Sequence, residues 1–226
     1  MRSDKATVRR RAKLSAMALV TAMLVALSMA TPAASTSAEH STSPVFRIAD
    51  VLGGTPVPVG SSTLVRNGNG VSATLDTTAL TPGDVVTLWW VVFNDPDGCQ
   101  AGIPNVSSCG PVDAQLGRGG VSPLRATGRI VDESGTAHYG AHLRRGDTSR
   151  ALVGPGLLDA RDAEVILVLK THGPKIPGLV SEQLHTFAGG CADQSDAPPG
   201  APAHLVGTPG PNECAEIQVS VHSPGE

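Results

Sequence analysis

The segment Val85-Val-Thr-Leu-Trp-Trp-Val-Val-Phe93 decides the fold, because all its residues except one threonine are apolar. β-Branched and aromatic residues dominate the segment, and these residue types favour a pleated strand. A run of this length without alternation is typical of a strand that is buried on both faces. Turn sequences delimit it on both sides, Leu80-Thr-Pro-Gly-Asp84 before and Asn94-Asp-Pro-Asp-Gly98 after. We therefore predict a central strand that contains both tryptophans.

Further strands are predicted on either side of this run. The residues from Val71 to Asp76 alternate between apolar and polar, as in a half-buried strand, and Glu164 to Thr171 is a second continuous apolar run. The spans 124–132 and 136–144 read as a hairpin, because the polar turn Asp132-Glu-Ser-Gly135 joins them. Strict alternation over 215–222 predicts a last strand, with Ala215, Ile217, Val219 and Val221 inward and Glu216, Gln218, Ser220 and His222 outward.

The rest of the chain is rich in turns. Apolar residues near helical spacing predict one short helix over 177–187, and the spans 53–70 and 192–213 read as long loops. The sequence contains 26 glycines and 18 prolines, and it shows neither a βαβ rhythm nor a repeat at a fixed period. We therefore predict an all-β, single-domain antiparallel β-sandwich, or a barrel-like variant of it, with long Gly/Pro-rich loops.

The N-terminal residues 1–38 read as a secretory signal peptide. A basic stretch that includes Arg9, Arg10, Arg11 and Lys13 precedes seventeen uncharged residues, Leu14 to Ala30, and small residues follow them. A retained membrane anchor is the alternative, but seventeen residues is at the short limit for a membrane span. We expect residues 39–226 to form a secreted, extracellular domain, without an integral membrane segment once the signal peptide is cleaved.

The charge of the exported chain bears on its partners. The first 38 residues hold six of the 17 basic residues and one of the 20 acidic ones, so their removal leaves a net charge of −8. Nucleic acid is therefore not an expected partner, because proteins that bind it neutralise phosphates with a basic excess. A protein, a glycan or a small ligand stays open as the partner.

The four cysteines, Cys99, Cys109, Cys191 and Cys214, all lie in the predicted exported domain. An even number of cysteines after a signal peptide predicts disulfides. Three pairings are possible, and the sequential one is favoured because each pair then brackets a loop: Cys99 with Cys109, and Cys191 with Cys214. A zinc site is the alternative, although the chain has no Cys-x-x-Cys spacing.

Part of the chain resembles a known group of proteins. The segment Leu80-Thr-Pro-Gly-Asp-Val-Val-Thr-Leu-Trp-Trp-Val-Val-Phe-Asn94 resembles one found in secreted bacterial proteins of uncharacterised function, and 167–174 and Gly189-Gly-Cys191 are similar to later segments of that group. This resemblance implies a secreted bacterial protein and no particular activity. Val71-Ser-Ala-Thr-Leu75, with the turn after it, is also similar to the CHRD module, a β-sandwich domain, whose paired His-x-His segment is missing here.

The sequence carries no strong catalytic motif. There is no Gly-x-Ser-x-Gly elbow, and the Gly-punctuated run 66–70 lacks the Lys-Ser/Thr of a phosphate-binding loop. Asn94, Asp95 and Asp97 precede Gly98 as in a calcium loop, but Pro104 stands where such a loop needs Glu. We interpret this segment as a turn next to Cys99, and catalytic residues and cofactors stay unknown.

Histidines are the candidate metal ligands. On a strand, residues four apart are roughly 13 Å apart, so His138 and His142 cannot bind one ion together. A copper or zinc site would have to combine strands, and His142, His172 and His222 come from three of them. The leading hypothesis is a non-catalytic extracellular or cell-envelope binding module. A metal-binding protein or enzyme that uses these histidines is the alternative, and a hydrolase without a recognisable motif is a third possibility.

Overall fold

The structure is a computed structural model that describes residues 37–225. Residues 1–36 of the predicted signal peptide lie outside this range. The described residues form eight strands: β1 (Glu39–Arg47), β2 (Pro58–Asn67), β3 (Gly70–Thr77), β4 (Asp84–Phe93), β5 (Val121–Ile130), β6 (Ala137–Arg144), β7 (Glu164–Pro174) and β8 (Ala215–His222). The helices between them are short: α1 (Ile48–Leu52), α2 (Pro111–Gln115), α3 (Val180–His185) and α4 (Ala203–Val206), with 3₁₀ turns at Pro96–Gly98 and Arg118–Gly120.

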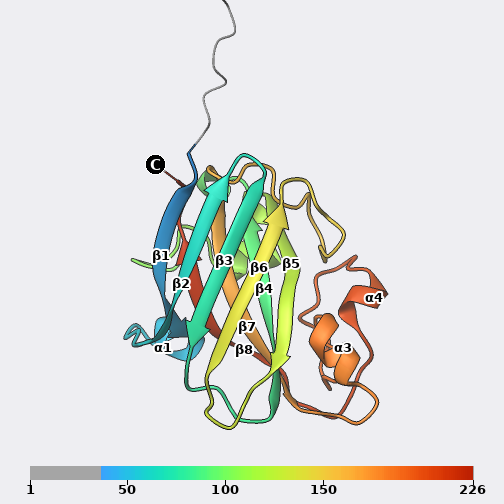
Figure 1. Ribbon diagram of the computed structural model, residues 1–226. Helices are drawn as coiled ribbons and strands as arrows, with labels where there is room; N and C mark the ends of the chain where they lie inside the picture. Colours follow the sequence, from blue (N-terminus) through green and yellow to red (C-terminus); the bar gives the residue numbers. More distant parts are fainter. Residues whose placement is uncertain (1–36, 226) are drawn as a thin grey trace, which may run out of the picture. The chain divides into compact units, whose positions relative to one another are not determined.

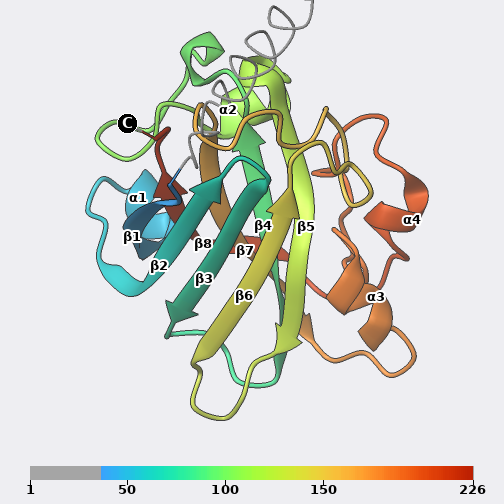
Figure 2. The same ribbon diagram turned by 45° about the horizontal axis from the view of Figure 1, so that its top comes forward.

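All eight described strands belong to one antiparallel sheet. Its order is β5-β4-β7-β8-β1-β2-β3-β6, so β5 and β6 are its two edge strands. The sheet curls until these edges lie beside each other and the barrel is nearly closed (Figures 1 and 2). The predicted all-β antiparallel fold is confirmed, in its barrel-like form. We call the line along which β5 and β6 face each other the seam.

The predicted hairpin of β5 and β6 is not formed, although both strands are present and the turn between them lies at Gly135. Within residues 37–225 no ladder joins the two strands. β6 pairs instead with β3 along its whole length, from Ala137 opposite Thr77 to Arg144 opposite Gly70. A turn sequence indicates that the chain reverses, but the partner of each strand is decided by how the sheet closes.

The sheet separates two apolar clusters. The first fills the barrel interior, with Leu64, Leu88, Trp90 and Leu167 among its fully buried members. The second lies outside the sheet against β4, β7 and β8, and it contains Trp89, Phe93, Ile166, Val168, Phe187, Val219 and the buried cysteines Cys109 and Cys191. β4 and β7 are therefore buried on both faces, as their continuous apolar runs predicted.

The predicted orientation of β8 is wrong from Gln218 to His222, although Ile217 packs against the interior cluster as predicted. The hydroxyl of Thr77 on β3 donates to the side-chain oxygen of Gln218 (2.6 Å), and the hydroxyls of Ser220 and Ser62 of β2 share a hydrogen bond (2.7 Å), so these polar side chains of β8 point into the barrel. Val219 packs in the outer cluster. Both faces of β8 are largely covered, and the apolar face therefore does not identify the barrel interior.

Two strands fall where the sequence predicted none. β1 begins at Glu39, directly after the predicted signal peptide, and β2 lies inside the span 53–70, for which the sequence predicts a loop. The sequence does not predict β2 because its inward residues include the polar Ser62 and Arg66, which break the alternation of apolar and polar residues. The guanidinium of the fully buried Arg66 donates hydrogen bonds to the backbone oxygens of four residues that close one end of the barrel: Ala160, Ala163, His222 and Ser223.

The span 177–187 contains α3, which is shorter than predicted and packs beside β4 and β5 (Figure 1). The buried Gln183 holds α3 to the end of β7, because its amide donates to the backbone oxygens of His172 (3.2 Å) and Pro174 (2.9 Å). The span 192–213 is irregular apart from α4, as expected.

Candidate functional site

His172, the first of the three predicted metal ligands, is a buried structural residue on the outer side of β7. Its Nε2 is 3.0 Å from the hydroxyl of Thr87, and its Nδ1 is 3.0 Å from the backbone oxygen of Gly189. Burial lowers the pKa of His172 to about 4, although the Gly189 oxygen opposes this shift. Both ring nitrogens already have partners, and the ring joins β4 and β7 to the loop that follows α3.

His222 lies on β8 and points into the barrel. Its Nδ1 is 2.8 Å from the hydroxyl of Ser41, and its Nε2 is 2.8 Å from that of Ser62. Burial, and next the positive charge of Arg66, lower the pKa of His222 to about 4. His222 is opposite Val165 in the ladder between β7 and β8, seven residues from His172. At about 3.4 Å per residue the two histidines are about 24 Å apart along the sheet.

His142 is exposed on the outer face of β6, where its Nδ1 is 2.9 Å from the hydroxyl of Ser72. β6 and β8 are separated by β1, β2 and β3 in the sheet, and the ring of His222 faces the opposite side. The structure therefore places His142, His172 and His222 at three separate positions, because a strand's face and register, which the sequence leaves open, decide where a ring points. It does not bring them together as ligands of one ion.

Both predicted disulfides are confirmed. Cys99 pairs with Cys109 at a Cα–Cα distance of 5.2 Å, and Cys191 pairs with Cys214 at 5.5 Å. The second bridge lies against the ring of His172, whose Nδ1 is 3.8 Å from the sulfur of Cys191. These three residues are grouped closely enough for a metal, but both sulfurs are bonded to each other and offer no thiolate. The bridges fit an oxidising environment such as the cell exterior.

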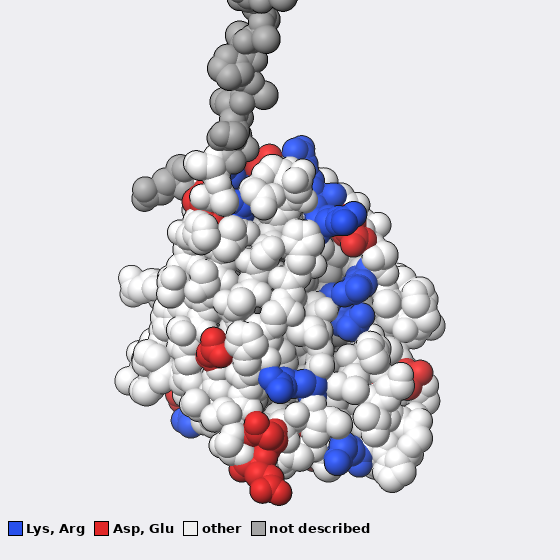
Figure 3. All heavy atoms as spheres, viewed as in Figure 1, with Lys and Arg blue, Asp and Glu red and all other residues white. Residues whose placement is uncertain are grey.

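A cleft lies at the seam and is the strongest candidate for a binding site. We call it the seam cleft; its volume is about 140 Å³, and it is lined by Trp90, Leu124, Arg125, His142, Leu143, Arg144, Asp147 and Arg150. Trp90, Leu124 and Leu143 are buried and form an apolar floor, and the charged side chains form the rim. Figure 3 shows basic side chains gathered near this line, between β6 and β5, and a wide, mostly uncharged surface over β2 and β3.

The backbone holds two of the arginines side by side. The N–H of Arg125 on β5 donates to the backbone oxygen of Arg150 (3.1 Å), and a guanidinium nitrogen of Arg150 is 3.3 Å from the backbone oxygen of Ala126. Burial, and then the charge of Arg150, lower the pKa of Arg125. The molecule therefore keeps two like charges close together, which costs free energy unless an anion lies between them.

Positively charged side chains outnumber negatively charged ones in the lining of the seam cleft. Asp147 is its one acidic lining residue, and its carboxylate accepts the N–H of Ser149 at 2.9 Å. This hydrogen bonding, together with Arg150 and Arg144, lowers the pKa of Asp147 although burial opposes the shift. Among the described residues, none of the ion pairs within 4.0 Å involves Arg125, Arg144 or Arg150. The cleft therefore offers guanidinium groups that no carboxylate of residues 37–225 neutralises at contact distance.

A second hollow lies at the other end of β6. It is lined by Gly60, Ser61, Asp76, Thr77, Thr78, Thr136, Ala137 and His138, and with a volume of about 530 Å³ it is larger and more open than the seam cleft. Its two ionisable side chains pair with each other, since Nδ1 of His138 is 2.7 Å from the carboxylate of Asp76. This hollow therefore presents no unpaired charge to a ligand.

Of the predicted ligands, only His142 lines the seam cleft. The arginines were not predicted, because Arg125 and Arg150 are far apart along the chain and meet only through the fold. One signal could have indicated them: five of the eleven basic residues after position 38 lie between 125 and 150. A local excess of arginine in an otherwise acidic domain is informative about anions.

Within the described residues, no helix combines the length and the apolar character that crossing a membrane requires. A scan against protein-family models finds no match to the chain, and a search of curated proteins finds none either.

Proposed function

We propose that this chain is a secreted, non-catalytic binding module of the cell exterior or envelope, and that the seam cleft holds an anionic group of its ligand. The observation that carries this proposal is the set of three arginines, Arg125, Arg144 and Arg150, around one concavity without a contacting carboxylate. Guanidinium groups match carboxylate, sulfate and phosphate oxygens with two parallel hydrogen bonds each.

The floor of the seam cleft narrows the ligand class. Trp90, Leu124 and Leu143 offer apolar contact below the charged rim. The volume of about 140 Å³ is close to that of an apolar cavity which holds one benzene molecule. These features favour an anionic group attached to a small apolar body over a bare inorganic ion.

The lining also supports binding rather than catalysis. No serine, threonine, cysteine or lysine is among its described residues, so no hydroxyl, thiol or amine nucleophile faces the site. The one histidine, His142, is hydrogen-bonded to Ser72 of the neighbouring strand.

Titration of the purified domain with benzoate and with benzyl alcohol tests the proposal. Benzoate is expected to bind and to shift the NMR signals of Trp90 and Leu143, whereas benzyl alcohol, of similar shape but uncharged, binds at least about tenfold more weakly. Arg125→Gln and Arg150→Gln should each weaken benzoate binding by about tenfold or more, because a charge-assisted hydrogen bond contributes about 1.5–3 kcal/mol.

Arg47→Gln is the matched control, because it removes the same charge at the end of β1, outside the cleft lining. It should leave benzoate binding unchanged. Equal binding of benzoate and benzyl alcohol, or an Arg47→Gln effect as large as that of Arg150→Gln, would contradict the proposal.

A further inference from the structure

β6 has one backbone edge, at the seam, that forms no ladder with another strand of residues 37–225. The guanidinium of Arg129 donates to the backbone oxygen of His138, which shows that this oxygen points away from β3 and toward β5. In an antiparallel strand the N–H and C=O of one residue point to the same side, and the side alternates along the strand. The backbone groups of Gly140 and His142 therefore also point into the seam.

The side chains of β6 agree with this register. His138 bonds to Asp76 and His142 bonds to Ser72, each directly across the ladder with β3. Side chains approach most closely in the pairs that exchange no backbone hydrogen bonds with each other. His138, Gly140 and His142 thus have main-chain groups that β3 does not use.

The two edges of the sheet are protected unequally. β5 contains Pro123, its ladder with β4 shifts register beside Trp89, and the chain at 150–152 pairs with its outer edge. Proline, register shifts and covering segments are the usual means by which proteins block an edge strand. β6 has neither proline nor lysine, and its register with β3 is unbroken over Ala137–Arg144.

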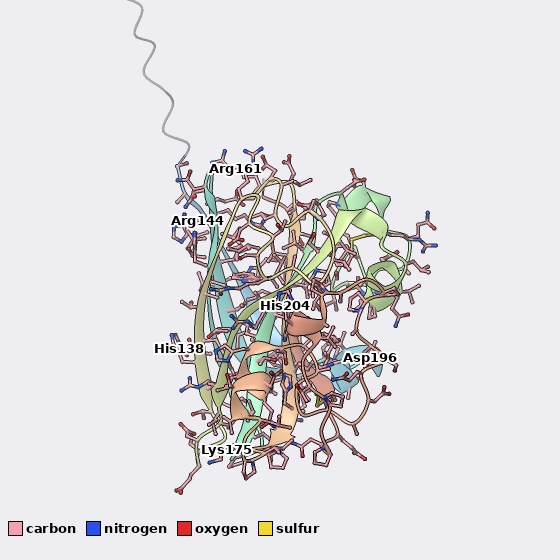
Figure 4. The ribbon with its side chains drawn as sticks, turned by 90° about the vertical axis from the view of Figure 1, so that its right-hand side faces the viewer. His138, Arg144, Arg161, Lys175, Asp196 and His204 are labelled. Atoms are coloured by element: carbon pink, nitrogen blue, oxygen red, sulfur yellow. A yellow bond between two sulfur atoms is a disulfide. The ribbon has the colours of Figure 1, made fainter. Side chains whose placement is uncertain are left out.

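The outer face of β6 is open in the middle of the strand. A Cβ atom at Gly140 would meet no other atom within 4 Å, so nothing in the described chain covers this outer face there. Figure 4 shows His138 and Arg144, near the two ends of β6, projecting from the same outer face. An extended segment placed beside Gly140 would reach, at the Arg144 end of β6, the arginines that form the rim of the seam cleft.

We infer that the ligand of the seam cleft is an extended acidic polypeptide segment that adds as a strand to the free edge of β6. This inference rests on the proposed function and names its partner. Main-chain hydrogen bonds to Gly140 and His142 would supply affinity, and acidic side chains that meet Arg125, Arg144 and Arg150 would supply specificity. A second copy of this chain is a poorer occupant, because pairing β6 with β6 would bring two sets of arginines together.

The experiment compares three peptides on the wild-type domain: Ac-Glu-Val-Glu-Val-Glu-Val-NH₂, the same peptide N-methylated at the glutamates, and the same peptide N-methylated at the valines. The N–H groups of alternate residues point to opposite edges of a strand. We expect one methylated peptide to bind at least tenfold more weakly than the parent and the other to bind about as well. Equal binding of all three peptides would show that charge alone attracts them, and would overturn the inference.

Two variants locate the edge. Gly140→Pro removes the central free N–H, and Gly140→Ala keeps it; both should bind benzoate as the wild type does. Gly140→Pro is expected to bind the acidic peptide at least tenfold more weakly, and Gly140→Ala as well as wild type. If Gly140→Pro does not fold, as circular dichroism would show, the methylated peptides on the wild-type domain decide the question.

The remaining outcomes separate this inference from the proposed function. Benzoate binding without binding of the acidic peptide overturns the inference alone. Displacement of benzoate by a sulfated polysaccharide but not by the peptide also overturns it and points to a glycan. A wild-type dimer that Gly140→Pro converts to a monomer would show that β6 serves self-association. Failure of benzoate and peptide alike overturns both.

Discussion

β7 and β6 lie in the same sheet and are covered very differently. Of the eleven residues of β7 all but two are buried, so both of its faces lie against apolar clusters. In β6, by contrast, buried residues such as Tyr139 and Leu143 alternate with exposed ones such as His138 and Arg144. The contrast shows that this barrel has one half wrapped by its own loops and one half left open to solvent.

The wrapping depends on the loops that the disulfides close. All four half-cystines belong to the outer cluster or pack against it, beside Trp89 and Phe187. The bridges therefore hold the outer layer against β4 and β7. On the open half the outer faces of β2, β3 and β6 carry mostly polar or charged side chains and no such layer, and the seam cleft lies at the border of this half.

The largest expected difference comes from truncating outer-face residues of the two halves. Trp89 is 3% exposed, stacks edge-on against Phe187 at 5.2 Å and donates its indole N–H to Thr87 (2.9 Å). Trp89→Ala should lower the free energy of unfolding by about 3–5 kcal/mol, because it leaves a cavity under the outer layer. Thr74→Ala, on the exposed face of β3, should change it by less than about 0.5 kcal/mol. Urea denaturation with the disulfides intact measures both, and similar losses would contradict the division into two halves.

Acid should destabilise the wrapped half through two histidines. The pKa values of His172 and His222 are lowered from 6.5 to about 4 in the folded protein, so the unfolded chain takes up protons that the folded chain cannot. Stability is then complete above about pH 6.5 and is lost as the pH falls toward about 4, by about 3 kcal/mol for each histidine.

Denaturation curves collected between pH 7 and pH 4 test this slope. His172→Gln and His222→Gln should each flatten it, whatever they do to stability at neutral pH. His185→Gln, at an exposed position on α3, should leave the slope unchanged. An unchanged slope in both buried-site variants would contradict the assignment.

The anchoring of the first disulfide loop should depend on one buried carboxylate. Glu164, at the start of β7, accepts hydrogen bonds from the hydroxyl of Ser107 (2.7 Å) and from the backbone N–H groups of Ser108 (3.0 Å) and Cys109 (3.1 Å). Glu164→Gln places a side-chain NH₂ group, which is a hydrogen-bond donor, opposite these O–H and N–H donors. The substitution should lower the free energy of unfolding by about 1–3 kcal/mol. Glu133→Gln, in the exposed turn before β6, is the control and should cost less than about 0.5 kcal/mol. Chemical denaturation of both variants provides the comparison.

The smallest expected effects come from two glycines on the two edge strands. A Cβ at Gly140 of β6 meets nothing within 4 Å, whereas a Cβ at Gly128 of β5 would lie 2.7 Å from the backbone oxygen of Leu184. Gly140→Ala should raise the free energy of unfolding by up to about 1 kcal/mol, because it restricts the unfolded chain. Gly128→Ala should lower it by about 1 kcal/mol or more, because α3 must move. Thermal and urea denaturation should therefore give shifts of opposite sign; shifts of the same sign would contradict the contrast between the edges.

The candidate site was much less predictable than the strands. The arginines of the seam cleft come from β5, from the end of β6 and from the segment after it, and they meet because the sheet closes and residues 150–152 pair with β5. His142, His172 and His222 are candidate ligands in the sequence because each lies in or next to a predicted strand. Spacing along one strand excludes a shared ion, as it did for His138 and His142, but spacing cannot show that residues on different strands converge.

The sequence by itself predicted six of the eight described strands, the turns that end its strongest apolar run, and the sequential cysteine pairing, because these depend on local composition and short loops. The signal peptide over residues 1–38 stays a prediction from the same kind of local pattern. The tertiary structure alone decided that β6 pairs with β3, that Ser220 and His222 face the interior, and that Arg125 meets Arg150. The physical reason is that strand partners and inward faces depend on the closure of the whole sheet. When both faces of a strand are buried, alternation no longer shows which face is inside.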